Sequence, residues 1–352
     1  MIRPPVLMCL TGFWLMRVGS GGWAQTASPV PLPPPPRAEL ESFVTPDRPV
    51  AELKKSAPAT TAKSADPAVS LVFAYQVLLD RNHFSPGCLD GQGGRQTEQA
   101  VMAWQQQNGL RPTGRFDNDT LVKMGSVRGT VATHRVTQSE CDRIGPVPKG
   151  WKEKAALGSL PYESVLESLA EKYHTTQNAL RQLNPGVVWP NPPAGTLVNV
   201  PNPQSAVPLG KAARVRISLT RKLIRVYDRQ GTLIAQFPCS IAQREEKRPV
   251  GTLKVLNYAP QPNYVFNPEL FVREAKAQGI TRKLIIPPGP NNPVGVAWVG
   301  LSLPGYGIHG TPRPEEIGIT ESHGCFRLAN WNAAKFLKMI SIGTPVEVRA
   351  DF

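Results

Sequence analysis

The sequence is short of several features that would point to particular classes of protein. Cysteine occurs only five times in 352 residues, and the 26 acidic residues are outnumbered by 40 Lys and Arg, which gives a formal charge of +14. No basic segment is interleaved with aromatic residues in the way that a nucleic-acid groove requires. We therefore expect an anionic partner other than a nucleic acid.

The first 24 residues have the pattern of an export signal. Arg3 precedes an apolar run over 6–16, and small residues at 22 and 24 suit a signal peptidase. The run is far shorter than the roughly 20 residues of a membrane span, although Arg17 behind it leaves an uncleaved anchor as the alternative. Cleavage would remove these two arginines and no acidic residue, so the charge of +14 would become +12. We predict a signal peptide over 1–24 and a location in the periplasm or cell envelope.

Two proline-rich stretches divide the rest of the chain. Residues 25–65 contain "PVPLPPPPRAEL" and no sustained apolar period, which predicts an extended, solvated tether. The stretch "PNPQSAVPLG" over 201–210 is a second linker. Because 352 residues suffice for two or three domains, we expect separate folded units on either side of the second linker.

Residues 66–126 predict a small three-helix unit. Asp66-Pro67 is a helix start, and apolar residues follow it with a 3.6-residue period. Two turn glycines, Gly91 and Gly114, each stand six residues before a threonine at a helix start. Together with "DG", "WQ" and "TG", this pattern resembles a peptidoglycan-binding domain of the three-helix type. Cys88 and Cys141 flank the unit and are either a disulfide or two separate thiols, since an exported protein folds in an oxidising compartment.

Residues 152–202 predict an α+β unit with two short helices. Val165, Leu166 and Leu169 share one helical face, Thr176 begins a second helix, and "AGTLVNVP" follows as a strand. This order resembles a LysM module, a fold that binds N-acetylglucosamine-containing glycans. The first strand of that fold is missing, with "LPYESV" in its place. The unit is therefore either a glycan-binding module or a structural spacer.

After the second linker the apolar period changes from helical to alternating. The segment "RVRISLTRKLIRVYDRQGTLIAQFPCSI" alternates apolar and polar residues around a turn at 228–231, which predicts a β-hairpin and a mainly-β domain. Cys239 lies on the return strand as a buried, inert side chain. Residues 266–289 fall between predicted strands, and we interpret them as a lid over a cleft.

A cysteine and two histidines lie within seventeen positions in "IHGTPRPEEIGITESHGC", namely His309, His323 and Cys325. A cysteine attacks as its thiolate, and a free pKa of about 8.5 calls for a neighbouring base near neutral pH. The backbone amides of Gly324 and Cys325 are candidate donors to a tetrahedral oxyanion. Gly324 also allows a substrate carbonyl to approach closely. The pattern predicts nucleophilic cysteine chemistry.

Three other roles for Cys325 stay open. A zinc site with His309 and His323 would need a fourth ligand, and His-x-Cys is not the usual spacing of paired zinc ligands. A disulfide would need Cys239, the only other cysteine of the domain. An inert buried thiol is the default for a lone cysteine, but the flanking residues argue against it.

The segments His309-Gly310 and "SHGC" resemble the signature of the YkuD-type L,D-transpeptidases. In that family an upstream histidine is followed, after a dozen or more residues, by Ser/Thr-His-Gly-Cys. The stretches "PPGPNNPVGVAWVGLSLPGYGIHGT" and "RPVGTLKV" extend the likeness. The resemblance implies a β-sandwich catalytic domain over 212–350 that needs no cofactor and no metal.

The resemblance also implies residue roles. Cys325 would be the nucleophile and His309 its base, while His323 and Gly324 would shape the oxyanion site. Five further residues would contact the substrate: Arg327, Ser322, Gly310, Tyr306 and Asn330. Four of them have alternatives. Arg327 is otherwise a solvated surface charge, Ser322 a residue that hydrogen-bonds within its own loop, Tyr306 a core residue, and Asn330 a helix cap.

The implied reaction is a two-step acyl transfer on peptidoglycan. Cys325 attacks the amide after the third residue of a tetrapeptide stem and expels D-Ala, and an amine of a neighbouring stem resolves the thioester into a cross-link. This chemistry serves cell-wall biosynthesis and cell shape. With water as acceptor the enzyme would be an L,D-carboxypeptidase, and with a protein lysine it would attach that protein to the wall.

The alternatives from other classes are a noncatalytic wall-binding scaffold and a zinc hydrolase. Peptidoglycan stem peptides and glycan strands are the expected partners, and the sequence does not indicate an oligomeric state.

Overall fold

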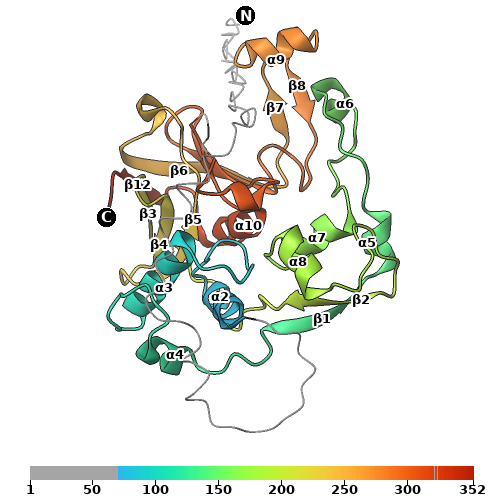
Figure 1. Cartoon of the computed structure of the whole chain (residues 1–352). Coiled ribbons are helices and arrows are strands. Elements are labelled where there is room, and N and C mark those ends of the chain that lie inside the picture. The colour runs from blue at the N-terminus through green and yellow to red at the C-terminus, as the bar shows by residue number, and fades with distance from the viewer. Residues whose placement is uncertain (1–69, 321, 323) are drawn as a thin grey trace, which may run out of the picture.

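The computed structural model describes residues 70–352 except Glu321 and His323 (Figure 1). The predicted signal peptide over 1–24, the tether over 25–65 and the helix start at Asp66-Pro67 lie outside the described residues. Within the described part of the chain, no helix has both the length and the apolar character needed to cross a membrane.

The N-terminal helical unit consists of three helices: α2 (Leu71–Arg81), α3 (Arg95–Gln107) and α4 (Asn118–Met124). Two buried glutamines explain why its turn pattern repeats. The Gln76 side chain accepts a hydrogen bond from the Gly91 backbone amide at 2.8 Å and donates to the Thr97 hydroxyl at 3.2 Å. Gln105 does the same in the second turn, with Gly114 at 2.9 Å and Thr120 at 2.7 Å. Each glutamine thus joins a positive-φ glycine to the helix that follows it.

The second unit, here called the strand–helix unit, has two paired strands with four helices between them in the chain. Strand β1 (Val131–Arg135) pairs antiparallel with β2 (Leu197–Pro201), and helices α7 (Val165–Lys172) and α8 (Gln177–Leu183) lie between them in the chain. The sequence interpretation that a first strand is missing was therefore wrong. The strand precedes the predicted range 152–202, and the short helices α5 (Gln138–Asp142) and α6 (Trp151–Ala155) separate it from α7.

The C-terminal domain is built on one eight-stranded sheet with the order β11-β10-β9-β6-β12-β3-β4-β5. Its pairs are antiparallel except β12 with β3 and β10 with β11. The hydrogen-bonded order is one continuous sheet, which fits the predicted mainly-β domain, although the prediction specified a sandwich. The strands are β3 (Arg214–Ser218), β4 (Leu223–Tyr227), β5 (Leu233–Pro238), β6 (Gly251–Pro260), β9 (Ala297–Leu301), β10 (Gly307–His309), β11 (Phe326–Arg327) and β12 (Pro345–Arg349).

Helix α10 (Asn330–Met339) follows β11 directly and lies against the sheet (Figure 1). Its Phe336 and Met339 are buried in one apolar cluster with Phe237 of β5 and Val299 of β9. Because α10 begins only five residues after Cys325, the packing of this helix fixes the end of the segment that carries the cysteine.

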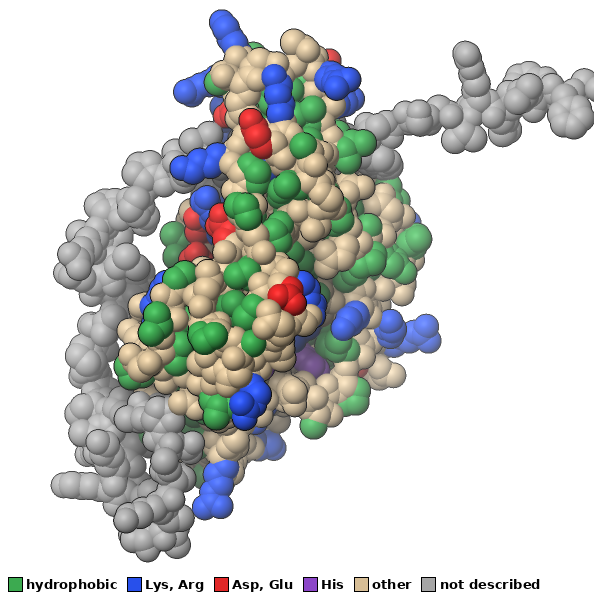
Figure 2. Space-filling model, turned by 90° about the vertical axis from the view of Figure 1, so that its right-hand side faces the viewer, with side chains coloured by type: hydrophobic (Ala, Val, Ile, Leu, Met, Phe, Trp, Pro, Cys, Tyr) green, Lys and Arg blue, Asp and Glu red, His purple; other side chains and the backbone are tan. Residues whose placement is uncertain are grey.

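The predicted lid is a hairpin that projects from the body of the molecule (Figure 1). It consists of β7 (Tyr264–Phe266), α9 (Val272–Ala277) and β8 (Leu284–Ile286). Trp151 of α6 stacks on Phe266 with ring centroids 4.6 Å apart, so the strand–helix unit contributes to the packing of the hairpin. Figure 2 shows Lys and Arg side chains at the projecting end of the molecule, where exposed Arg273, Lys276, Arg282 and Lys283 belong to the hairpin.

The three units meet at the buried carboxylate of Asp80, on α2, which faces Lys335 of α10. Asp80 of α2 is fully buried, and its Oδ2 lies 2.9 Å from Lys335 Nζ and 2.9 Å from His174 Nδ1. The His174 ring also stacks on Trp331 with centroids 5.3 Å apart. Each unit thus supplies part of one network, which ties both N-terminal units to the C-terminal domain.

Asp80→Ala should therefore destabilise the protein strongly. Removing one partner of a buried ion pair leaves the other charge uncompensated, which typically costs about 3–5 kcal/mol. Asp119→Ala is the control, because Asp119 is exposed on α4 of the same unit. Thermal unfolding followed by circular dichroism should show a clear fall in Tm for Asp80→Ala only, and equal Tm values for the two variants would contradict a stabilising role for the network.

Candidate active site

The cysteine lies in a tight loop immediately before β11. Cys325 is 2% exposed, and its Sγ lies 3.6 Å from the carbonyl oxygen of Gly305. The Ser322 hydroxyl donates to the Cys325 carbonyl at 2.5 Å and accepts from the Gly324 amide at 3.2 Å. Ser322 therefore forms hydrogen bonds within the nucleophile loop, which is one of the two roles predicted for it from the sequence. A substrate oxyanion would have to replace Ser322 to bind the Gly324 amide.

His309 ends β10 as a neutral imidazole with a defined tautomer. Its Nδ1 lies 2.7 Å from the carbonyl oxygen of Gly310, and since a carbonyl can only accept, Nδ1 carries the proton. The lone pair is then on Nε2. His309 is 3% exposed, and burial lowers the pKa of its imidazole to about 4. The ring also stacks on Trp298 with centroids 5.7 Å apart, so its orientation is fixed on two sides.

Strand pairing brings the histidine and cysteine segments together. Strands β10 and β11 are parallel, with Ile308 opposite Phe326 and His309 opposite Arg327. The amide of Leu328 donates to the His309 carbonyl at 2.8 Å. The segments of His309 and Cys325, sixteen residues apart in the chain, are therefore neighbours at one edge of the sheet, as the predicted pair of base and nucleophile requires. His323, the other predicted histidine, lies outside the described residues.

Arg327 is buried beside the nucleophile loop. It is 5% exposed, its backbone exchanges two hydrogen bonds of 3.0 Å with Ser240, and its guanidinium donates to the Thr320 hydroxyl at 2.9 Å. Burial lowers the pKa of the guanidinium from its usual value. The alternative of a solvated surface charge was wrong, because Arg327 is part of the site's interior.

Tyr306 and Gly324 pack against each other. A Cβ at Gly324 would lie 3.4 Å from the Tyr306 ring, which is van der Waals contact. Tyr306 is half-buried, and burial followed by its proximity to Cys325 raises the pKa of its phenol. Tyr306 therefore borders the nucleophile loop, where the sequence left cleft and core as alternatives.

Asn330 is buried and does not cap the helix that it begins. It is 1% exposed and is the first residue of α10, which has Ala329 at its N-cap position and no side-chain cap. The Asn330 amide nitrogen donates to the carbonyl of Pro290 at 3.1 Å, and its Oδ1 accepts from the Val296 amide at 3.2 Å. The helix-cap alternative was wrong, and the side chain holds the backbone beside His309 instead.

The other cysteines in the described part of the chain are not cross-linked. Cys88, Cys141 and Cys239 are free thiols. Of the two alternatives for Cys88 and Cys141, a disulfide or two separate thiols, the structure therefore shows two separate thiols. Cys88 lines a cavity, whereas Cys141 packs in the core of the strand–helix unit. Among the described residues no cluster of three or more His, Cys, Asp or Glu side chains could hold a metal, and the zinc alternative also involves His323, which is not described.

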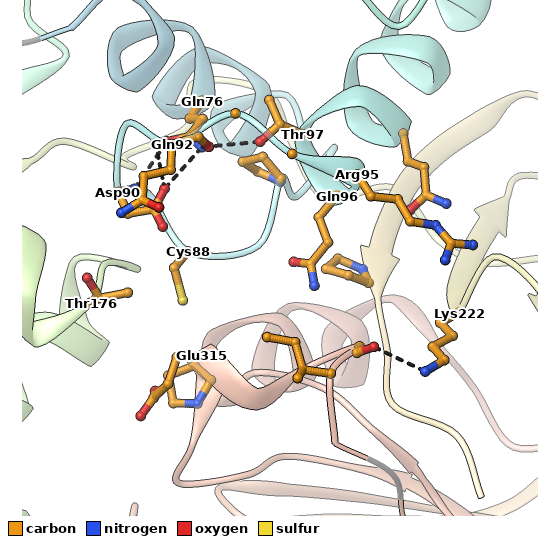
Figure 3. Close-up of a pocket in the computed structure, with 18 of the residues that line it drawn as sticks. Gln76, Cys88, Asp90, Gln92, Arg95, Gln96, Thr97, Thr176, Lys222 and Glu315 are labelled. Carbon is orange, nitrogen blue, oxygen red and sulfur yellow. Dashed lines mark hydrogen bonds between the residues drawn. The ribbon is translucent and has the colours of Figure 1, made fainter. Parts of the chain in front are cut away.

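Two cavities border the segment between His309 and Ser322. One, of about 390 Å³, lies between the N-terminal helical unit and the C-terminal domain; Gln96, Lys222 and Glu315 line it, and Thr176 of the strand–helix unit also reaches it (Figure 3). The other, of about 880 Å³, is lined largely by the strand–helix unit and shares Thr176 and Glu315 with the first. No sequence motif predicts these cavities, because each wall comes from a different unit.

Comparisons with known proteins agree with the motif. Residues 212–348 match the family model described as the L,D-transpeptidase catalytic domain YkuD, and residues 69–124 match a putative peptidoglycan binding domain. The predicted family and peptidoglycan-binding domain are thus confirmed, whereas the LysM resemblance of 152–202 stays a prediction.

Relatives and solved structures are similar over part of this chain. The putative L,D-transpeptidase YkuD of Bacillus licheniformis is 30% identical over 186 residues, which cover 52% of this chain and 92% of that protein. The probable L,D-transpeptidase YbiS of Escherichia coli is 28% identical over 52% of this chain, which spans only 59% of that relative's length. An L,D-transpeptidase structure from Mycobacterium smegmatis matches with 22% identity and a TM-score of 0.30, covering 39% of this chain and 58% of that one.

Proposed function

Because the chain belongs to the YkuD family of L,D-transpeptidases, we propose that it is an exported enzyme that cross-links peptidoglycan stem peptides through a thioester at Cys325. The observation that carries this proposal is the neutral His309, whose Nδ1–H donates to Gly310 and leaves Nε2 as a base on the strand beside the cysteine segment. A noncatalytic wall-binding scaffold has no need of a buried, oriented imidazole at that position.

The mechanism follows from these groups. Nε2 of His309 takes the thiol proton while Sγ of Cys325 attacks the carbonyl carbon between the third stem residue and D-Ala. The backbone amide of Cys325, and that of Gly324 once the oxyanion displaces the Ser322 hydroxyl, stabilise the oxyanion. The buried Arg327 pairs with a stem carboxylate. The tetrahedral intermediate collapses, the C–N bond breaks, and the His309 proton leaves with D-Ala. An acceptor amine then loses a proton to His309, attacks the thioester and releases the free thiol.

Apolar surroundings favour an amine acceptor over water. Cys325 belongs to a buried cluster with Leu160, Tyr264 and Trp298, so little water reaches the thioester. Hydrolysis is therefore disfavoured, and cross-linking is preferred to L,D-carboxypeptidase activity. The low exposure of the thiol also means that the hairpin or the 147–160 segment must move for a stem peptide to enter.

The N-terminal units place the enzyme on its substrate. The peptidoglycan-binding unit lies against the C-terminal domain through Asp80, so a glycan strand bound there stays near the active site. The paired strands β1 and β2, with helices α7 and α8 directly before β2, support the LysM resemblance and a second glycan contact. The exposed cations of the hairpin suit the anionic carboxylates of the wall.

Product analysis tests the proposed reaction. The purified chain is incubated with a disaccharide-tetrapeptide fragment, and the products are separated and weighed by liquid chromatography and mass spectrometry. We expect cross-linked dimers that contain one fewer D-Ala than the two fragments. Formation of tripeptide alone would replace cross-linking with carboxypeptidase activity, and unchanged substrate would refute both activities.

A further inference from the structure

We propose that Glu171, on α7 of the strand–helix unit, is a positioning residue for His309 and acts through Asn330. The proposal rests on the proposed function for its kinetic readout, but its geometry is independent of the substrate. Under this proposal, a residue of an N-terminal unit, outside the matched range 212–348, helps to orient the catalytic base.

The first link joins Glu171 to Asn330. Glu171 Oε2 accepts a hydrogen bond from Asn330 Nδ2 at 2.8 Å across the boundary between the two units. The same Nδ2 donates to the Pro290 carbonyl, and Asn330 Oδ1 accepts from the Val296 amide. Since Asn330 is buried, water cannot easily take over these bonds when one partner is removed.

The second link joins Asn330 to the base. Its Oδ1 lies so close to Gly295 and Gly310 that a Cβ at either position would overlap with it. The carbonyl of Gly310 is the acceptor that orients the His309 Nδ1–H. A shift of the Asn330 amide therefore moves the backbone of Gly310 and, with it, the direction of the His309 lone pair.

Glu171 is itself held in place. The Tyr162 hydroxyl donates to Glu171 Oε1 at 2.7 Å, so each carboxylate oxygen has a separate donor. Burial raises the pKa of this carboxyl to about 7, because burying the charged form costs free energy. A helix residue whose only role is packing would not need a carboxyl at this position. Glu167, one turn earlier, also crosses the boundary, but it accepts from Asn291 and has no bond to Asn330.

The matched variants follow from this difference. Glu171→Leu keeps the size and burial of the side chain but leaves Asn330 Nδ2 without its carboxylate. Glu171→Gln keeps both bonds, because its amide oxygen accepts from Asn330 and its nitrogen donates to the Tyr162 oxygen. Glu167→Leu removes one bond across the same boundary and controls for loosened docking of the units.

The experiment measures single-turnover acylation by a tetrapeptide stem in the full-length chain. We expect Glu171→Leu to lower the acylation rate about 10- to 100-fold with little change in KM, since a displacement of about 1 Å at a reacting group costs up to roughly 100-fold. Glu171→Gln should restore the rate to within about threefold, and Glu167→Leu should match the wild type. Nitrogen NMR of His309 should show a weakened Nδ1–H hydrogen bond in Glu171→Leu only.

Equal rates for Glu171→Leu and Glu167→Leu, or a failure of Glu171→Gln to restore the rate, would overturn the proposal. If Glu171→Leu does not fold by circular dichroism, Glu171→Asp carries the test. Its shorter carboxylate cannot keep both bonds, so a wild-type rate in that variant would also overturn it. If the wild type itself is not acylated, the proposed function fails, and the His309 NMR signal alone decides the role of Glu171.

Discussion

With alanine in place of Cys325, release of D-Ala from a tetrapeptide stem should fall to the uncatalysed background. The expected loss is about 10⁴-fold or more, as is typical when the nucleophile of an acyl-transfer enzyme is removed. Water cannot readily substitute, because Cys325 is 2% exposed within an apolar cluster. D-Ala release measured with a coupled amino-acid oxidase assay provides the rates.

Cys239→Ala is the matched control for that loss. Cys239 is buried in the same domain, and burial raises the pKa of its thiol, which disfavours the reactive thiolate. We expect this variant to retain the wild-type rate. Equal losses in the two variants would indicate that any core cavity disables the enzyme, and a Cys325→Ala variant with substantial activity would exclude thioester chemistry.

Replacing His309 by glutamine should lower the acylation rate by about 10²- to 10⁴-fold, the usual contribution of a general base. Glutamine fills a similar volume and can still donate to the Gly310 carbonyl, but it supplies no basic lone pair at the Nε2 position. His134→Gln is the control, since His134 lies in β1 and bonds to Glu140 and Tyr173 away from the site. A wild-type rate in His309→Gln would contradict the assigned base.

The pH dependence of the wild type follows from the same residue. Burial lowers the pKa of His309 to about 4, so the imidazole stays neutral and able to accept a proton down to that pH. Between pH 7 and pH 5 the acylation rate should therefore not fall through protonation of His309. An exposed histidine with its usual pKa of about 6.5 would lose most of its base form over that interval. A rate that halves near pH 6.5 would show that His309 is solvated when it acts.

The sequence predicts the parts of the site that are close together in the chain. His309 and Cys325 stand out because seventeen residues contain both, and the turn glycines Gly91 and Gly114 stand out because their spacing repeats. These patterns are local, and the structure adds their reason, such as the buried glutamine in each turn.

The sequence could not predict the parts that depend on distant contacts. Glu171 and Asn330 are 159 positions apart, and Asp80 and Lys335 are 255 apart, so no spacing rule links them. Strand β1 was missed because its residues are half-buried or exposed and show no clear apolar alternation. Arg327 was left open because a buried arginine and a surface arginine look the same in one sequence.

The most direct test of the central claim is the intact mass of the protein after incubation with a tetrapeptide stem fragment, measured beside Cys325→Ala. We predict that the wild type gains the mass of the tripeptide acyl group and that the variant gains nothing. Digestion should place the adduct on the peptide that contains Cys325. Folded, reduced wild-type protein that forms no adduct, or an adduct that persists in Cys325→Ala, would contradict a thioester enzyme.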